Sequence, residues 1–152
     1  MHSIFAKAVA FDEALTSDFV EYQKQVILNA QIMANKLLKH GINLVSKDIK
    51  NHMFLMNFLD QDFSGKQVES WLDDINITTN KNTVPFDIRS PFQTSGIRIG
   101  TPAITTRGMK ANEMEIIADI IAKKINNPSD VVLNNELEHK VLALCAKFPI
   151  MN

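Results

Sequence analysis

The segment Ser17–His40 constrains the fold most, because it predicts one long amphipathic helix. Ser17 is a plausible N-cap, and Gly41 is typical of the position just after a helix end. Between them, apolar side chains recur three, four or seven residues apart, so they lie along one side of the helix. This side is the predicted contact with the core, and its members are Phe19, Tyr22, Val26, Met33 and Leu37.

Short apolar segments after this helix predict a small sheet. Ile42–Ser46 and His52–Asp60 are separated by a polar turn, and we expect them to pair as antiparallel strands. The second segment is apolar on both faces, so we expect it in the middle of the sheet. Further short strands are predicted at Ile77–Thr79 and Gly96–Gly100.

Most of the remaining segments predict helices. A short helix is expected over Ser64–Ile75, with its first residue as the N-cap, and Thr101 is the expected N-cap of another. Two longer helices are predicted over Asn112–Ile125 and Asp130–Phe148. Helices that flank three or four short strands indicate an α+β fold class.

The first residues predict one more helix, with an apolar side that includes Ile4, Phe5 and Val9. Neither an N-cap nor a loop precedes this pattern, whereas most helices begin with one. We therefore expect this sequence to be part of a longer protein.

Composition excludes several classes of protein. A length of 152 residues and a hydrophobic content of 45% suit one domain with its own core. The formal net charge of −1 argues against nucleic-acid binding, which uses clustered basic residues. No apolar run approaches the ~20 residues of a membrane-spanning helix, and the four histidines show no metal-ligand spacing. The single cysteine, Cys145, excludes an internal disulfide and fits a cytoplasmic protein.

Arg98 is the leading candidate for a binding residue. In the predicted strand Gly96–Gly100 it shares one face with a glycine on either side, because successive side chains alternate. The guanidinium can pair bidentately with a carboxylate or phosphate, and the glycines would leave that face open to a ligand. The alternative is an exposed arginine in a weak surface ion pair, with glycines present for a bulge. The strand alone favours the alternative.

The loop before this strand, Asn80–Gly96, is the second candidate. It has no helical or strand period, and long loops in compact domains are often functional. The amides of Asn80 and Asn82 can hydrogen-bond a heterocycle, and Phe92 can stack on a flat ring. The alternative is a purely turn-forming role for Asn, Ser and Pro, and spacing alone favours it.

The run NKNTVPFDIRSPFQTSGIRIGTPAITTRGMK, Asn80–Lys110, resembles the C-terminal region of serine hydroxymethyltransferases. The segments MHSIFAKAVAFDEAL, NHMFLMNF and FSGKQVESWL resemble further parts of that family, so the resemblance covers the whole chain. It implies the small C-terminal domain of the pyridoxal-phosphate-dependent aspartate-aminotransferase-like fold, over residues 17–152. In such a domain a short, mostly antiparallel sheet is covered by helices, and residues 1–16 would be the interdomain helix that precedes it.

The family interconverts serine and glycine, with tetrahydrofolate as the one-carbon carrier, and so serves one-carbon metabolism and glycine biosynthesis. The resemblance implies that Arg98 binds the carboxylate of the amino-acid substrate and that Asn82 contacts the pterin ring of the folate. Ser90, Pro91 and Phe92 match a short loop assigned to folate binding. The adjacent positions 88 and 89 vary among relatives and carry no assigned role.

One departure from the family concerns the cofactor. The lysine that holds pyridoxal phosphate follows a threonine-rich stretch, and no such stretch occurs in this sequence. The resemblance therefore implies a chain with no catalytic residue and no metal ligand, inactive alone and not expected to bind the cofactor alone. Its partners would be a large cofactor-binding domain and further copies, in a homodimer or homotetramer. The alternatives are a stand-alone module that binds small carboxylates or folates, and one half of a split enzyme.

Overall fold

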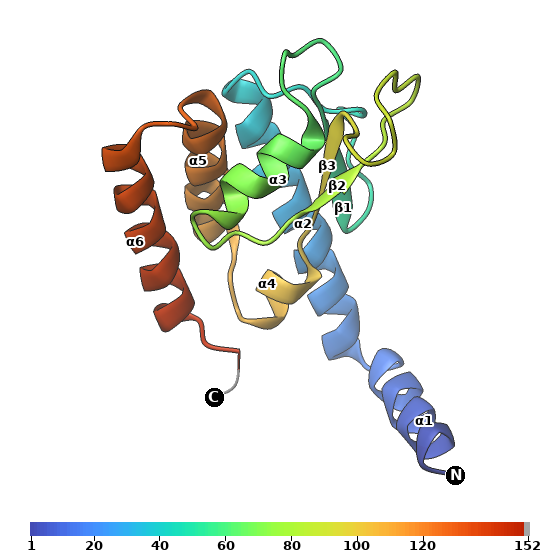
Figure 1. Ribbon diagram of the computed structural model, residues 1–152. Coiled ribbons are helices and arrows are strands. Elements are labelled where there is room, and N and C mark those ends of the chain that lie inside the picture. Colours follow the sequence, from blue (N-terminus) through green and yellow to red (C-terminus); the bar gives the residue numbers. More distant parts are fainter. Residues whose placement is uncertain (151–152) are drawn as a thin grey trace.

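The computed structural model describes residues 1–150 and confirms a mixed α+β architecture (Figure 1). Over these residues the chain forms six helices and one three-stranded antiparallel sheet. No helix in residues 1–150 combines the length and the apolar character needed to cross a membrane. In chain order the elements are α1 (His2–Ala14), α2 (Ser17–Lys39), β1 (Met53–Asn57), α3 (Gly65–Asp73), β2 (Asn80–Asn82), β3 (Gly96–Gly100), α4 (Pro102–Thr106), α5 (Ala111–Asn126) and α6 (Val131–Lys147).

The long predicted helix is α2, which packs against α5, α4 and β1. Its N-cap is Thr16 rather than Ser17, because the Thr16 hydroxyl accepts a hydrogen bond from the Phe19 backbone N–H at 3.2 Å. The helix ends before Gly41, whose φ of +79° suits glycine. The buried side of α2 consists of Val26, Asn29, Ala30, Met33, Ala34 and Leu37.

The strand order is β1-β3-β2, so β3 and not β1 is the central strand. The expectation that His52–Asp60 lies in the middle of the sheet is therefore wrong in part. One antiparallel bridge, from Leu44 to Met56, flanks β1 on its other side. The predicted strand Ile42–Ser46 is reduced to this bridge, although the predicted antiparallel direction is confirmed.

The predicted strand Ile77–Thr79 is also wrong, because β2 starts at Asn80. The Ile77 backbone N–H still donates to the Leu72 carbonyl at 2.9 Å, which continues the end of α3. Strand pairing begins at Asn80, and the backbone N–H of the next residue, Lys81, donates to the Glu69 carboxylate of α3 at 2.9 Å.

The core lies between the sheet and its covering helices. Phe54 and Met56 of β1 and Ile97 and Ile99 of β3 point into one cluster with α2, α3 and α5. A second cluster joins α6 to α5 and includes Leu137. Figure 1 shows the resulting layers, with α6 outside α5 and the sheet on the opposite side of the molecule.

The two predicted caps of the shorter helices have different outcomes. Ser64 caps α3 as expected, in a reciprocal capping box with Gln67. Thr101 precedes α4 but makes no side-chain cap. Its hydroxyl instead donates to the Val26 carbonyl of α2 at 2.8 Å, and this bond ties the end of β3 to the core helix.

Helix α1 has no buried residue and extends away from the rest of the fold (Figure 1). Its apolar side chains occur on more than one side, and a helix of this kind is normally covered on several sides. The exposed fractions are 67% for Ile4, 67% for Phe5, 59% for Val9, 68% for Phe11 and 86% for Leu15.

We expect the chain to self-associate through α1. Exposed apolar surface of this extent drives association in water. Sedimentation velocity should show a mass that rises with concentration, and the double variant Phe5→Asp/Phe11→Asp should weaken this association about tenfold or more. A wild-type chain that stays monomeric at high concentration would contradict this prediction.

Candidate functional site

The outer face of the sheet, turned away from the helices, carries the candidate site. The register places Arg98 of β3 between Leu55 of β1 and Asn80 of β2. Since cross-strand partners share a face, these three side chains lie on the outer face while Ile97 and Ile99 anchor β3 in the core. The fold therefore fixes the backbone under Arg98 and leaves its side chain exposed.

A cavity of about 450 Å³ lies over this face. Arg98 and Asn82 both line it, so the structure brings together two of the residues that the sequence singled out. Its opposite wall is the segment before β1, which pairs with β1 through Leu44. The wall residues include Val45, Ser46, Asp48, Ile49, Lys50 and Asn51.

The Arg98 guanidinium has no ion pair and no hydrogen bond with any residue in 1–150. The ion pair of the alternative interpretation is therefore not formed within residues 1–150, although Arg98 is exposed as that interpretation expected. An arginine with free donors in a cavity can receive a carboxylate in the bidentate geometry that guanidinium favours.

The two glycines beside Arg98 have different roles. A Cβ at Gly96 would lie 2.7 Å from Val84 Cγ1, 2.8 Å from the Asn82 carbonyl oxygen and 2.9 Å from that of Met56. Gly96 is therefore required by close packing, and the expectation that it opens the face to a ligand is wrong. A Cβ at Gly100 would meet nothing closer than 3.6 Å, so only that side of Arg98 is open.

Neither the lysine that lines the cavity nor the fully buried lysine fits a covalently held pyridoxal phosphate. Lys50 lines the cavity, but its amino group is 2.9 Å from the Asp48 carboxylate and its side chain is 81% exposed. Lys124 is fully buried, but it donates to the Pro128 carbonyl at 3.0 Å and does not line this cavity. No cofactor chemistry can be assigned to either residue.

Ser90, Pro91 and Phe92 lie outside the cavity, on an exposed bend of the loop between β2 and β3. The Ser90 carbonyl accepts the backbone N–H groups of Gln93 and Thr94, each at 2.9 Å. The Phe92 ring is 81% exposed and can stack on a flat ring. These three residues therefore do not line the cavity that Arg98 and Asn82 share.

The interior of this loop is held by Asp87 and Arg89, neither of which the sequence singled out. The Asp87 carboxylate accepts hydrogen bonds from the Ser95 hydroxyl at 2.7 Å and from three backbone N–H groups. Burial opposes ionisation, but these hydrogen bonds outweigh it and hold the pKa of Asp87 below its usual value. The signal in the sequence was one acid and one base close together in a proline-containing loop, at positions 87 and 89.

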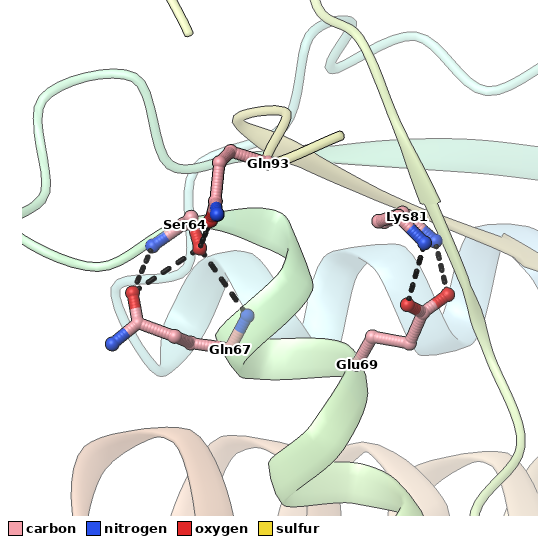
Figure 2. Close-up of polar contacts among 5 residues, drawn as sticks. All are labelled: Ser64, Gln67, Glu69, Lys81 and Gln93. Carbon is pink, nitrogen blue, oxygen red and sulfur yellow. Dashed lines mark hydrogen bonds and ion pairs between the residues drawn. The ribbon is translucent and has the colours of Figure 1, made fainter. Parts of the chain in front are cut away.

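Helix α3 anchors the loop and β2 from the other side (Figure 2). The Ser64 hydroxyl at its N-terminus lies 3.1 Å from the Gln93 side-chain oxygen. One turn further on, the Glu69 carboxylate accepts both the backbone N–H of Lys81, at 2.9 Å, and its ammonium group, at 3.0 Å. Since Lys81 neighbours Asn82, this ion pair fixes the strand that presents the Asn82 amide.

Comparisons with known proteins agree with the resemblance in the sequence. The family model described as serine hydroxymethyltransferase matches residues 1–121. A serine hydroxymethyltransferase of Francisella tularensis subsp. tularensis (strain WY96-3418) is 52% identical over 150 residues, which cover 99% of this chain and 36% of that protein. One of Acinetobacter radioresistens is 47% identical with the same coverage. The chain thus spans about 36% of the length of the curated relatives that it matches.

Gly96→Ala and Gly100→Ala should differ sharply in their effect on stability. The first places a Cβ against backbone oxygens that cannot move aside, so we expect a loss of about 2 kcal/mol or more in the free energy of unfolding. The second fills open space and should change it by less than about 0.5 kcal/mol. Urea denaturation of both variants measures this, and equal stabilities would contradict the proposed packing at Gly96.

Asp87→Asn should destabilise the chain in a pH-dependent way. The pKa of Asp87 is lower in the folded state than in the unfolded state, where it has the ordinary value of about 3.9. The ionised carboxylate therefore stabilises the fold above this pH, and the stabilisation is lost as the pH falls through the pKa of the folded state. At pH 7 we expect Asp87→Asn to lower the free energy of unfolding by about 1–3 kcal/mol. The carboxylate has two oxygens that accept four hydrogen bonds, whereas the amide has only one oxygen to accept them. Urea denaturation at pH 7 and pH 3 should show this difference shrinking in acid.

A control for this prediction is Glu21→Gln, which removes a carboxylate from an exposed pair with Lys24. Exposed pairs contribute little, so its stability should match the wild type at both pH values. If Asp87→Asn lowered the free energy of unfolding by the same amount at both pH values, the conclusion that Asp87 is ionised and stabilising at pH 7 would be contradicted.

Proposed function

Because this chain belongs to the serine hydroxymethyltransferase family, we propose that it supplies the substrate-carboxylate arginine and part of the folate site of an enzyme that interconverts serine and glycine. Tetrahydrofolate is the one-carbon carrier in this proposal. The reaction belongs to the whole enzyme, and the chain spans about 36% of its relatives' length.

The single observation that carries the proposal is Arg98 itself, which is unpaired within residues 1–150 and lines the cavity beside Asn82. Backbone pairing on both sides of β3 fixes the base of the arginine before any ligand arrives. Two parallel N–H donors match the two oxygens of an α-carboxylate, and both bonds are charge-assisted. Arg98 would thereby bind and orient serine or glycine through the one group that the two amino acids share.

Asn82 is proposed to contact the pterin ring. Its amide nitrogen donates to the Thr83 carbonyl at 2.8 Å, which fixes the amide and leaves Oδ1 as the acceptor for an N–H of the ring. Ser90, Pro91 and Phe92 are proposed to contact the folate elsewhere, with the Phe92 ring as a stacking surface.

Pyridoxal phosphate would act as the electron sink in the complete enzyme, held by a lysine that this sequence does not contain. We therefore assign the chain binding and orientation of substrate and not the reaction at the cofactor. Residues 1–16 would be an interdomain segment and residues 17–152 the small domain. A large cofactor-binding domain would complete each subunit. The subunits would form a cytoplasmic homodimer or homotetramer.

Arg98→Ala should raise the KM for serine about 100-fold or more in a chimaeric enzyme in which this chain replaces the matching 36% of the Francisella relative. The variant removes two charge-assisted hydrogen bonds, each contributing about 1.5–3 kcal/mol. Arg98→Lys should recover only part of this loss, because an ammonium cannot form the bidentate pair. Arg107→Ala, which removes bonds to the Phe148 and Cys145 carbonyls, is the matched control and should leave the KM within about threefold.

An unchanged KM for serine in Arg98→Ala would contradict the assignment. Calorimetry of the isolated chain with glycine and with a reduced folate tests the alternative of a stand-alone binding module. We expect no measurable binding, since one arginine in an incomplete site must overcome the whole association entropy. A tight complex that Arg98→Ala abolishes would support that module instead.

A further inference from the structure

Most large apolar side chains of the loop between β2 and β3 are exposed, whereas its charged side chains, Asp87 and Arg89, are half-buried. Phe86 is 93% exposed, Ile88 is 85% exposed and Phe92 is 81% exposed. These three side chains bury almost no surface within residues 1–150, and burial of apolar surface orders the loop only near its start, at Val84. The conformation of the rest of the loop depends on polar contacts.

A continuous chain of hydrogen bonds joins Arg89, Ser95 and Asp87. The Arg89 guanidinium donates to the Ser95 hydroxyl at 2.7 Å, and this hydroxyl donates to Asp87 Oδ1, also at 2.7 Å. Ser95 is fully buried, so its hydroxyl is shielded from water at the centre of this chain of hydrogen bonds. A base at position 89 and an acid at position 87 are thus linked through one buried hydroxyl.

The same three residues tie the loop to the sheet. Arg89 also donates to the carbonyls of Phe58, at 3.2 Å, and Gln61, at 2.5 Å, which follow directly after β1. Asp87 accepts the backbone N–H groups of Val84, Arg89 and Ser95 at 3.2, 3.0 and 2.8 Å. The loop is therefore fixed on both sides of Ser90–Phe92.

We propose that Asp87, Arg89 and Ser95 are positioning residues that set the conformation of Ser90–Phe92 for the folate. This inference rests on the proposed function and adds residues to which the family resemblance assigned no role. Without these contacts the loop would have to be ordered by the incoming ligand, and that ordering entropy would reduce the affinity. With them, the exposed Phe92 ring and the Ser90 bend are held in place before binding.

The inference predicts separable effects on the two substrates. Arg98 is fixed by backbone pairing to β1 and β2, and its side chain makes no hydrogen bond or ion pair with Asp87 or Arg89. Loosening the loop should therefore weaken folate binding and leave serine binding intact. A merely structural role would raise both KM values or lower the yield of folded protein.

The kinetic test uses the same chimaeric enzyme with Arg89→Ala, Arg89→Lys and Ser95→Ala. We expect Arg89→Ala and Ser95→Ala to raise the KM for tetrahydrofolate about tenfold, with the KM for serine within twofold of wild type. Arg89→Lys should rescue part of this effect, because one ammonium can still reach a carbonyl or the hydroxyl. Arg107→Ala should change neither KM. Equal rises in both KM values would overturn the inference.

A second measurement uses the 152-residue chain itself and requires no activity. In hydrogen exchange, Arg89→Ala should speed exchange at least tenfold at the amides of Gln93, Thr94 and Ser95, while the β1–β3 amides keep their protection. Arg107→Ala should leave the loop amides unchanged. Unaltered loop protection in Arg89→Ala would overturn the inference even in an active chimaera. A wild-type chimaera that cleaves no serine would contradict the proposed function, and the exchange result would still decide whether these residues position the loop.

Discussion

The antiparallel pairing of β3 with β1 and β2 is the interaction on which the rest of the structure depends. It places Ile97 and Ile99 in the core and Arg98 on the opposite face in a single register. A slip by one residue would bury the guanidinium and expose both isoleucines, so the core and the site select the same register. The hydrophobic effect thereby fixes the position of a charged side chain that contributes nothing to the core.

The close approach at Gly96 connects this register to the candidate folate residues. Because Gly96 has no Cβ, Val84 can pack over it and the backbone at Asn82 can pair closely with β3. Glu69 supports the same strand from the other side through Lys81. Burial raises the pKa of Glu69, but the hydrogen bonds from Lys81 and the charges of Lys81 and Lys66 outweigh it and hold this pKa below its usual value. The Asn82 amide is thus placed by one small residue and one ion pair, neither of which contacts the cavity.

The hydrophobic periodicity of the sequence predicted α2 and β3, and the residue type at position 64 predicted the Ser64 cap. These predictions failed for segments whose secondary structure is decided by a tertiary contact. Segment 42–46 is apolar enough for a strand, yet it makes only one bridge, and segment 77–79 is held by the end of α3. Asp87 and Arg89 were missed because charged residues in a loop are usually solvated, and only the folded chain brings them to Ser95.

The two parts of the candidate site therefore rest on different kinds of interaction. Arg98 depends on backbone hydrogen bonds, which most substitutions elsewhere in the strands leave intact. The Ser90–Phe92 bend depends on three specific side chains, so a change in any one of them alters its conformation. A family motif can consequently point to Arg98, the proposed carboxylate-binding residue, from sequence alone. The shape of the loop must be read from the contacts of residues that the motif leaves unassigned.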